Sequence, residues 1–591
     1  MTTPSSTHAH LIVVGGTPAG IMAAIAAARR GKTAIILERS RHVGGLPANG
    51  LGATDIGTRG LAGGLFRSFV ERVRAHYVAT YGEGSPQVKA CGDGFHFEPS
   101  VGERVLLAML AEHPGITVRL QRQFDALPAR VARDGARLKS VAVVDRATGK
   151  DETYTGEAFI DATYEGDLAA AAGVPFSTRR EGVAELHEPC AGVVYKAWSE
   201  PAAMPDSSGV GDDTLQAYNY RLCLTDVPAN RVTIAKPATY ERDEYVSLID
   251  DLRLNRHPGK YHGEAEWDGI GRVTNIVWLP NGKTDANNQH LAFISTDLPV
   301  ENWPWPTADW AWRDRFELRL RDYILGLLWF IQNDAEVPES FRANASRFGL
   351  AKDEYADNGH FPRQAYVREG RRIAGEASFI AHDALPVAEG ARPPIHPTSI
   401  TASHYAIDSH AVRKREAGKA HLDGFLSVHT KPYTVPYGVI VPRTVDNLWV
   451  PVAVSASHLG FGTLRMEPCW MVLGEAAGAA AVLADELGVA ARAVPLNELQ
   501  RELIAHRAVL IHYRDVERDH PAFAGLQLLG VRGGIPAWEA ALDRPLNGDE
   551  AARWNRLVGQ VFAAAGETRA SALTRLGQGL KRQIPAGAAA G

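Results

Sequence analysis

The sequence predicts an α/β fold (α+β overall) that begins with a Rossmann-like dinucleotide-binding unit. Two observations predict it. The apolar run 11–14 leads directly into the glycine-rich turn 15–20, and an alanine-rich helical stretch follows. A second apolar run, 33–37, then ends on Glu38, 23 residues after Gly15. Strand, turn, helix, strand and acid in this order are typical of a unit that holds a dinucleotide.

The turn reads GGTPAG. Its glycines let backbone N–H groups approach a pyrophosphate, and the helix that follows directs its N-terminal dipole at that negative charge. Glu38 stands where an acid accepts hydrogen bonds from the ribose hydroxyls. Thr17 replaces the middle glycine of the usual G-x-G-x-x-G pattern, which requires an ordinary φ at that position. Pro18 suits the first turn of a helix, where its missing N–H costs little.

Length and composition limit the number of domains, the kinds of partner and the location that we expect for this protein. A chain of 591 residues predicts two to four domains, and a net charge of −5 argues against nucleic acid as a partner. No apolar run is long enough to span a bilayer, and no secretory signal is visible, so we expect a cytoplasmic protein. The cysteines are scattered singly without a C-x-x-C motif, which predicts neither a dithiol centre nor a metal site.

The first part of the chain continues as expected for such a domain. A glycine-dense segment, 38–64, is suited to wrapping closely round a ligand. Helices are predicted at about 64–78 and from Glu98-Pro99-Ser100 onward, and a β-meander over 116–148. A strand then ends on Asp161-Ala162-Thr163, and a helix begins at Gly166-Asp167.

Residues 186–434 are predicted to form an inserted substrate-binding domain. Polar clusters at 218–221, 281–288, 357–362 and 368–376 make it the expected substrate-facing region, whereas its tryptophans at helical spacing are expected to pack a core. The segment 435–485 returns to the first domain, so that 8–185 and 435–485 form one discontinuous domain. Residues 486–591 are predicted to be mostly helical.

Several motifs together resemble a large family of FAD-dependent oxidoreductases with the FAD-binding fold of glutathione reductase. They are the N-terminal unit, IDATYEGDLAAAAGV at 160–174 and HLGFGTLRMEPCWMVLGEAAGAAA at 458–481, with NGKTDANN and YVREGRRIAGE between them. The resemblance covers nearly the whole chain. It is specific for cofactor and fold and weak for substrate, because this fold hosts many chemistries.

The resemblance implies FAD as the cofactor and a set of residues that hold it. The pyrophosphate would lie on the turn, Glu38 would bind the ribose, Arg39 would lie along the adenine, and Phe124 would offer backbone groups to it. The helix after residue 467 would direct its N-terminus at the flavin pyrimidine. The full implied set is Gly15, Gly16, Thr17, Pro18, Ala19, Gly20, Glu38, Arg39, Gly44, Gly45, Leu46, Phe124, Asp161, Ala162, Thr163, Arg465, Met466 and Glu467.

His458 is the first candidate for a catalytic base, because it comes just before the helix expected to face the flavin. The alternative is a histidine that only fixes a loop. Arg465 either stabilises a reduced flavin or a substrate carboxylate, or forms a structural pair with Glu467 or Asp408. Weaker candidates are Tyr437, His404, His410 and Lys283.

Two further features are interpreted structurally. The basic set Arg368, Arg371 and Arg372 is expected to include at least one member on a solvated helical face. His42, just before Gly44-Gly45, is expected to be a non-covalent neighbour of the flavin rather than its covalent anchor.

No second glycine-rich βαβ fingerprint follows residue 64, so a separate NAD(P)H domain is not predicted. The leading hypothesis is an FAD-dependent dehydrogenase or oxidase. It would remove hydride from a CH–OH, CH–NH or CH–CH unit of a small or medium polar molecule, such as a sugar derivative or natural-product intermediate, and pass electrons to oxygen, a quinone or another acceptor. The alternatives are an NAD(P)H-dependent flavin monooxygenase and a non-catalytic FAD-bound scaffold. An oligomer is compatible with the sequence.

Overall fold

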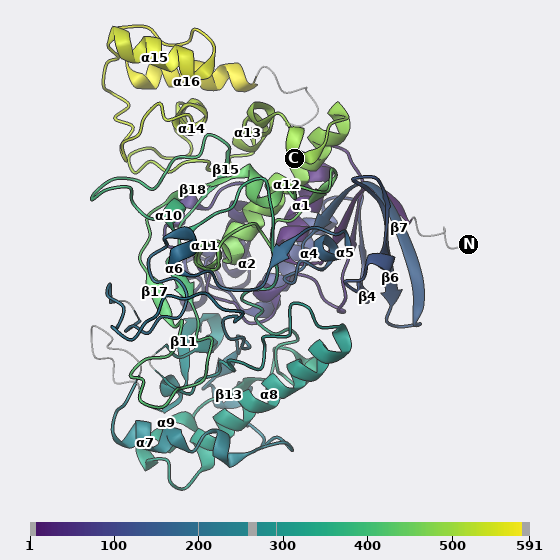
Figure 1. The fold of residues 1–591 in the computed structure, drawn as a ribbon, viewed down its shortest axis with the longest axis vertical. Coiled ribbons are helices and arrows are strands. Elements are labelled where there is room, and N and C mark those ends of the chain that lie inside the picture. Colours follow the sequence, from purple (N-terminus) through teal and green to yellow (C-terminus); the bar gives the residue numbers. More distant parts are fainter. Residues whose placement is uncertain (1–6, 199, 258–268, 291, 582–591) are drawn as a thin grey trace.

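The computed structural model describes residues 7–198, 200–257, 269–290 and 292–581. Figure 1 shows a central sheet and its helices, with α7, α8 and α9 at one end of the long axis and α14, α15 and α16 at the other. No helix in the described ranges is long and apolar enough to cross a membrane. The candidate site residues lie in the central part and on the segments that connect it to the α8 end.

The central sheet begins as a parallel sheet. β1 (His8–Val14) pairs with β2 (Ala34–Leu37) on one side and β7 (Lys150–Asp161) on the other, and β2 pairs with β3 (Ile116–Arg119). All four residues of β2 and the last four of β1 are buried, as expected for parallel strands covered on both faces. The α/β class predicted from the sequence is confirmed.

An antiparallel extension follows on the far side of β7. There β6 (Arg137–Asp145) pairs with β7, with β4 (Arg122–Gln123) and with β5 (Val131–Asp134). The predicted meander over 116–148 is wrong at its beginning, because residues 116–119 form the parallel edge strand β3. Its short apolar pattern is the same for either pairing, so the partner strand could not be read from it.

Two helices far apart in the sequence form the core over one face of the sheet. They are α1 (Pro18–Arg29) and α12 (Glu467–Leu487). A Cβ added at Gly474 would lie 2.2 Å from the Ala19 carbonyl oxygen, and one at Gly478 would lie 2.1 Å from that of Ala23. The two glycines therefore let the helix backbones approach more closely than any side chain permits.

Beside these helices, β19 (Leu448–Trp449) adds a parallel strand to β7. The segment that contains β19 and α12 thus returns to the N-terminal sheet. The remaining helices of this part are α2 (Gly64–Tyr81), α3 (Pro86–Ala90), α4 (Pro99–Ala111), α5 (Asp167–Ala171) and α6 (Val183–Leu186).

The α8 end holds a second sheet, which is antiparallel in the order β10-β13-β9-β12-β11. Its strands are β9 (Leu224–Thr225), β10 (Arg231–Val232), β11 (Thr274–Leu279), β12 (Lys283–Asn288) and β13 (Gly349–Ala351). The helices are α7 (Ser247–Arg253), α8 (Trp310–Asn333) and α9 (Glu339–Ala345). Trp305 is 2% exposed, so core packing of this tryptophan is confirmed.

Short paired strands connect this end to the central sheet. They are β8 (Phe176–Ser177) with β14 (Arg372–Ile373), β15 (Ser399–Ser403) with β18 (Tyr433–Pro436), and β16 (Ile407–Ser409) with β17 (Leu426–Val428). Two short helices, α10 (Ala381–Ala384) and α11 (His458–Leu464), lie among them.

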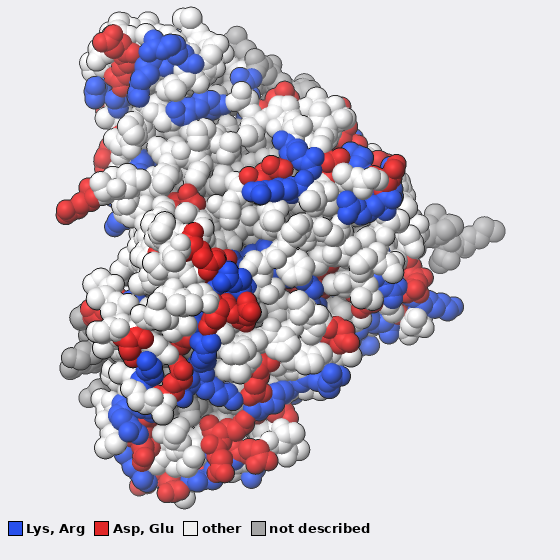
Figure 2. Space-filling view, viewed as in Figure 1, with Lys and Arg blue, Asp and Glu red and all other residues white. Residues whose placement is uncertain are grey.

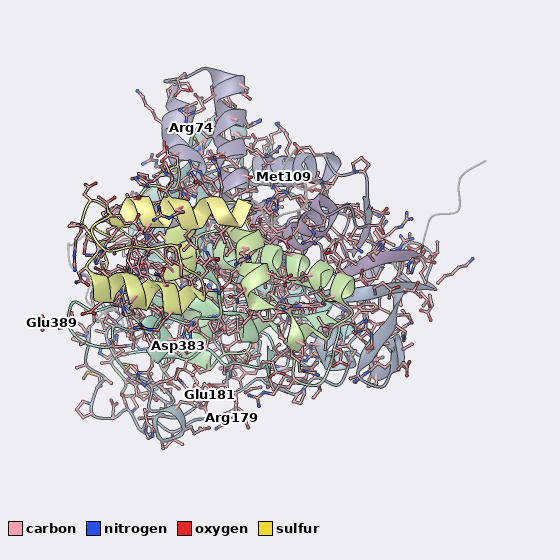
Figure 3. All side chains as sticks on the ribbon, turned by 90° about the horizontal axis from the view of Figure 1, so that it is seen from above. Arg74, Met109, Arg179, Glu181, Asp383 and Glu389 are labelled. Atoms are coloured by element: carbon pink, nitrogen blue, oxygen red, sulfur yellow. The ribbon has the colours of Figure 1, made fainter. Side chains whose placement is uncertain are left out.

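The C-terminal part contains α13 (Leu496–Ala505), α14 (Phe523–Gly530), α15 (Gly548–Val558) and α16 (Arg569–Lys581). Figure 3 looks down on this end, where the yellow C-terminal helices lie nearest the viewer. The boundaries at 185, 434 and 485 stay a prediction.

Candidate functional site

The glycine-rich turn lies at the carboxyl end of β1, between β2 and β7. The Gly15 N–H donates to the Leu37 carbonyl, and Gly15 adopts φ +101°. A Cβ there would lie 2.7 Å from the Ala162 carbonyl oxygen. Glycine is therefore required at this position both by its backbone conformation and by the close approach of β7.

Thr17 caps α1 in place of the expected glycine. Its φ is −68°, its hydroxyl accepts from the Gly20 N–H, and it donates to the Ala162 carbonyl at 2.8 Å. Pro18 takes the first helical position. The threonine thus satisfies one N–H at the helix start and also ties the turn to the end of β7.

Glu38 faces this turn from the end of β2. One carboxylate oxygen accepts from the Gly16 N–H at 2.8 Å, and the other accepts from the Ser40 N–H at 2.7 Å. Gly44 lies alongside, since its N–H donates to the Gly16 carbonyl. No cation pairs with this carboxylate in the described structure, so it can accept hydrogen bonds from ribose hydroxyls.

Asp161 and Thr163 close the same edge from β7. The Asp161 carboxylate is fully buried and accepts from the Thr163 hydroxyl and from the Ala169 N–H of α5. Burial raises the Asp161 pKa to about 6. These two side chains thus join the strand end to α5, while the Ala162 backbone faces Gly15.

The N-terminus of α12 reaches this edge through Glu467. The Tyr164 hydroxyl donates to one Glu467 oxygen and accepts from the Leu46 N–H at 3.1 Å, beside Gly45. The other Glu467 oxygen is buried and has no hydrogen-bond partner among the described residues. Met466, the cap residue, contributes no side-chain hydrogen bond.

The residues at this edge fit a dinucleotide. They supply a backbone cradle that a Cβ at Gly15 would fill, a carboxylate bound only by N–H groups, two helix N-termini, and an unpartnered buried oxygen on Glu467. The donors and acceptors are those that a pyrophosphate, a ribose and a flavin ring require.

Glu467 gives the protein a pH-dependent stability. Burial raises its pKa to about 8, whereas an exposed glutamate ionises near 4.5. Between these values the folded state holds one more proton than the unfolded state, so stability falls as pH rises through that window, by up to about 1.4 kcal/mol per pH unit. Glu467→Gln is expected to flatten this dependence, as measured by urea unfolding of the FAD-bound protein at pH 6 and pH 9. An unchanged difference between the two pH values would contradict this assignment.

Arg39 and Phe124 both contact Trp310, the first residue of α8. The Phe124 carbonyl accepts from the Trp310 indole N–H at 2.8 Å, and the Arg39 guanidinium lies 4.0 Å from the Trp310 ring centroid. Arg39 also makes a bidentate pair with Asp314. The two residues predicted for the adenine end are thus brought together, with Trp310 between them.

His458 lies at the first position of α11, in a buried series of hydrogen bonds. The Glu369 carboxylate lies 2.8 Å from its Nδ1, and the Ser409 hydroxyl lies 3.1 Å from its Nε2. Burial acts to raise the Glu369 pKa, but the His458 and Arg372 charges outweigh burial and hold this pKa below its ordinary value. Since an ionised Glu369 only accepts, Nδ1 carries a hydrogen, and in the neutral ring Nε2 is then the acceptor that faces the Ser409 hydroxyl.

Arg465 is the C-cap of α11, about two turns after His458, and is 1% exposed. It donates to the Tyr366 hydroxyl at 2.8 Å and pairs with Asp408 at 3.0 Å. Burial alone would raise the Asp408 pKa, but the neighbouring His410 and Arg465 charges hold this pKa well below its ordinary value. Of the two structural partners considered for Arg465, the one found is Asp408.

The Asp408 pair continues into a chain of buried ions. His410 lies 3.6 Å from Asp408 through Nε2 and 2.8 Å from Asp297 through Nδ1, and Asp297 in turn pairs with Arg368 at 2.8 Å. Asp408 and Ser409 are adjacent on β16, so they face opposite sides, one toward Arg465 and the other toward His458. The strand therefore joins the two groups of side chains.

Polar atoms without partners gather in this chain of ions. The Arg465 Nε, the Arg368 Nε and one Asp408 oxygen are buried and have no hydrogen-bond partner among the described residues. Two are donors and one is an acceptor, which suits a ligand with both kinds of group.

The expectation of a solvated helical face among the basic set is wrong. Arg368, Arg371 and Arg372 are all buried, and they lie in extended chain that leads into β14. Arg371 pairs with Asp167 at 2.6 Å, and Arg372 pairs with Glu181 at 2.9 Å. Each arginine has an acid from a distant segment, which no local pattern reveals.

The side chains of the weaker catalytic candidates make hydrogen bonds or ion pairs with other residues. The Tyr437 hydroxyl accepts from the Trp449 indole and donates to the Ala491 carbonyl, and no described contact joins it to His458 or Arg465. Lys283 is bound by three carboxylates, and His404 by the Thr58 hydroxyl. Both His42 ring nitrogens lie within 3 Å of carboxylates, those of Glu103 and Asp357.

Four residues of these networks were not singled out from the sequence. They are Tyr164, Asp297, Glu369 and Trp310. Tyr164 follows the Asp161-Ala162-Thr163 motif directly, so its position near the strand end was a usable signal. Glu369 lies in the polar cluster 368–376 that the sequence assigns to the substrate-facing region, and nothing local marks Asp297 or Trp310.

The chain is similar in sequence to one family of known proteins. A family model described as FAD dependent oxidoreductase matches residues 10–503. No curated protein matches the sequence. Among solved structures the chain is similar to THI4 from Thermovibrio ammonificans, at 16% identity over 30% of this chain and 67% of that one, with a TM-score of 0.22.

Two further solved structures are similar over a comparable part. The flavin-dependent monooxygenase PieE, in complex with FAD and substrate, is 19% identical over 30% of this chain and 34% of its own, with a TM-score of 0.20. Glycerol-3-phosphate dehydrogenase from Bacillus halodurans, complexed with FAD, is 12% identical over 34% of this chain and 45% of its own, with a TM-score of 0.21. At these values the likenesses carry no argument about the reaction.

Proposed function

Because this chain belongs to the FAD dependent oxidoreductase family, we propose that it is a dehydrogenase or oxidase that removes hydride from a small or medium polar organic substrate. When bound, FAD supplies the hydride acceptor. The observation that carries the proposal is the buried series Glu369–His458–Ser409, which lies beside the Arg465–Asp408 pair.

The series supplies a base, because one nitrogen of the neutral His458 ring carries no hydrogen. Glu369 holds the Nδ1 hydrogen, so His458 Nε2 is the proton acceptor, and Ser409 already lies on it. A substrate O–H or N–H proton passes to Ser409 oxygen as the Ser409 hydrogen passes to Nε2. The adjacent C–H leaves as hydride, so the substrate is oxidised by two electrons and one proton stays on His458.

The ion chain orients the substrate. Arg465 and Arg368 each offer an unpartnered N–H, and Asp408 offers an unpartnered oxygen. A substrate with several hydroxyl or carbonyl groups satisfies both kinds of atom, which favours sugar derivatives and polar natural-product intermediates over apolar substrates.

We propose the cofactor positions on the same basis. The pyrophosphate lies on the turn from Gly15 to Gly20 with Gly44 and Gly45, and the ribose lies on Glu38. The adenine end lies toward Arg39 and Phe124, and the flavin lies toward Glu467. The domain that carries them consists of residues 8–185 and 435–485, with 186–434 as the substrate-binding domain.

The test is anaerobic reduction of the bound flavin. A panel of polar alcohols, amines and acids is added to the purified FAD-bound protein without NAD(P)H, and the flavin absorbance near 450 nm (about the usual value for oxidised flavins) is followed. Bleaching by one class of substrate supports the proposal. Bleaching by NADPH alone, with an oxygenated product in air, would instead identify a monooxygenase. The reoxidation rate with oxygen and with a quinone then identifies the acceptor.

A further inference from the structure

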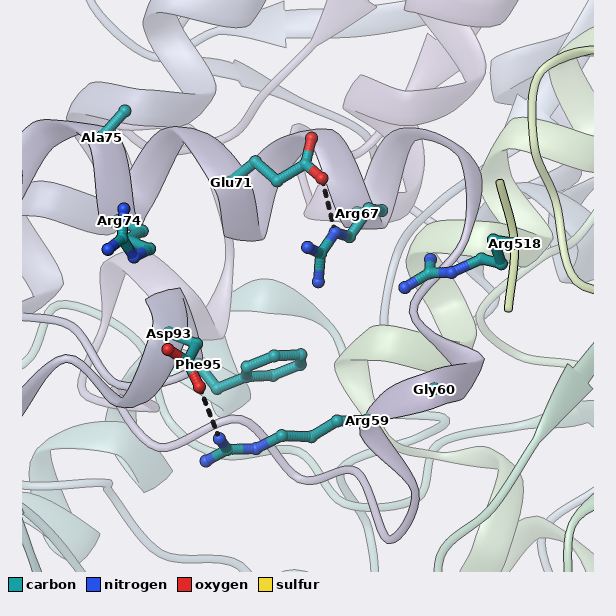
Figure 4. A pocket seen from close by; sticks show the side chains of 9 residues that line it. All are labelled: Arg59, Gly60, Arg67, Glu71, Arg74, Ala75, Asp93, Phe95 and Arg518. Carbon is teal, nitrogen blue, oxygen red and sulfur yellow. Dashed lines mark hydrogen bonds and ion pairs between the residues drawn. The ribbon is translucent and has the colours of Figure 1, made fainter. Parts of the chain in front are cut away.

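A cavity beside α2 lies apart from the residues assigned above. Its volume is about 590 Å³, and it is lined from α2, from the segments around 59–60 and 93–95, and from the loop before α14. Figure 4 shows its charged side chains, which are Arg59, Arg67, Glu71, Arg74, Asp93 and Arg518. Four guanidinium groups face two carboxylates, so the lining carries an excess of positive charge.

On the face shown in Figure 2, basic and acidic side chains are interspersed rather than gathered by sign. In the cavity, Arg67, Glu71 and Arg74 recur every three to four positions and therefore lie on one face of α2. Arg74 lies near the outer edge of the molecule in Figure 3 and pairs with Glu83, which is not part of the lining.

Arg67 keeps most of its donors unused. Only its Nε is engaged, with Glu71 at 2.6 Å, and neither Nη atom makes a hydrogen bond to a described residue. Figure 4 shows this guanidinium directed away from the α2 backbone, into the space shared with Arg518. The one ion pair of Arg59 to a described residue is a long contact to Asp93, at 3.5 Å.

Arg518 makes no hydrogen bond or ion pair with any described residue, although it is half-buried. Burial and the neighbouring Arg67 charge lower its pKa. A cation in this position is unfavourable by itself, since it has lost part of its hydration and lies near another cation. An anion between Arg518 and Arg67 removes both costs.

The inner wall of the cavity is aromatic. Phe95 is 2% exposed, and the Arg59 guanidinium lies 4.7 Å from its ring centroid. Arg59 therefore lies over the ring, and the two side chains together form this wall. Its volume exceeds that needed for an inorganic ion and is within the range of small-molecule sites.

We propose that this cavity binds a small organic phosphate, with the phosphate between Arg67 and Arg518 and the organic part in the remaining volume beside Arg59. A phosphate carries about two negative charges at neutral pH, so the excess positive charge of the lining attracts it, and its oxygens accept from guanidinium groups that approach from different elements. This site is separate from the proposed oxidation and does not depend on it.

The test measures phosphate binding to the FAD-bound protein, in which the cofactor itself fills the nucleotide site. Inorganic phosphate is titrated by calorimetry into wild type, Arg518→Gln and Arg72→Gln. Arg72 is on the same helix but pairs with Glu112 away from the cavity, so it controls for the loss of one charge. We expect Arg518→Gln to weaken binding at least tenfold and Arg72→Gln to change it less than twofold.

A second variant and a second anion complete the experiment. Arg67→Gln is expected to weaken phosphate binding as Arg518→Gln does, and it replaces that variant if circular dichroism shows misfolding. Succinate, a planar dicarboxylate, is expected to bind more weakly than phosphate. Equal losses in the Arg518 and Arg72 variants, no saturable binding, or succinate binding as tight as phosphate would overturn the proposal.

Discussion

Replacing His458 with Asn is expected to slow reduction of the bound flavin by about 100- to 10,000-fold, while the FAD content stays unchanged. The substitution removes the proposed proton acceptor without opening a large cavity. Glu369→Gln is expected to give a smaller loss, because a glutamine can still contact Nδ1 but no longer stabilises the protonated ring. The measurement is anaerobic stopped-flow with a substrate that bleaches the wild-type flavin.

The matched control is His382→Asn. His382 is exposed on α10 and lies 2.9 Å from the His187 carbonyl, away from the buried series. It is expected to reduce its flavin at the wild-type rate. A His458→Asn protein that matches wild type in rate and in its pH profile would show that this histidine only fixes the start of α11.

Asp167→Asn is expected to destabilise the protein by about 3–5 kcal/mol, because it leaves two buried cations without their counter-charge. Arg313 makes two contacts to this carboxylate, at 2.6 and 2.9 Å, and Arg371 makes a third at 2.6 Å. All three side chains are at most 5% exposed. Burial acts to raise the Asp167 pKa, but the Arg313 charge outweighs it, so the group is ionised in the folded state.

The measurement is the urea midpoint of the FAD-bound protein at fixed FAD concentration, since bound ligand adds to apparent stability. Asp134→Asn is the control, because its side chain is 82% exposed and lies 4.0 Å from Lys139. It is expected to change stability by less than about 0.5 kcal/mol. Equal midpoints for Asp167→Asn and wild type would show that water or another acid compensates the two arginines.

The parts of the fold that could be predicted from the sequence are those whose residue pattern lies within one short stretch of the chain. The turn at Gly15, the acid at Glu38 and the helix after Arg465 each carry glycine, charge or apolar patterns within about thirty residues. Even the departure at Thr17 could be interpreted, because capping is a local property. The partner of a strand is not local, and for that reason residues 116–119 were assigned to the wrong pairing.

The same distinction holds for the candidate site. His458 and Arg465 were found from their position before an apolar helix, but their partners were not. Glu369 precedes His458 by 89 positions and lies in the polar cluster 368–376, which the sequence assigns to the substrate-facing region without indicating a partner for Glu369. Whether such charged side chains are buried or solvated decides what they do, and the order of charges along the chain does not reveal which of the two applies.

The glycine contact between α1 and α12 also orders events during synthesis. Gly478 leaves the ribosome 455 residues after Ala23 (478 − 23), an interval of roughly 20 to 90 seconds at ordinary elongation rates. Until α12 arrives, the apolar surface of α1 has no permanent cover and the turn has no second helix beside it. The nucleotide site is therefore completed long after its sequence signature has been translated.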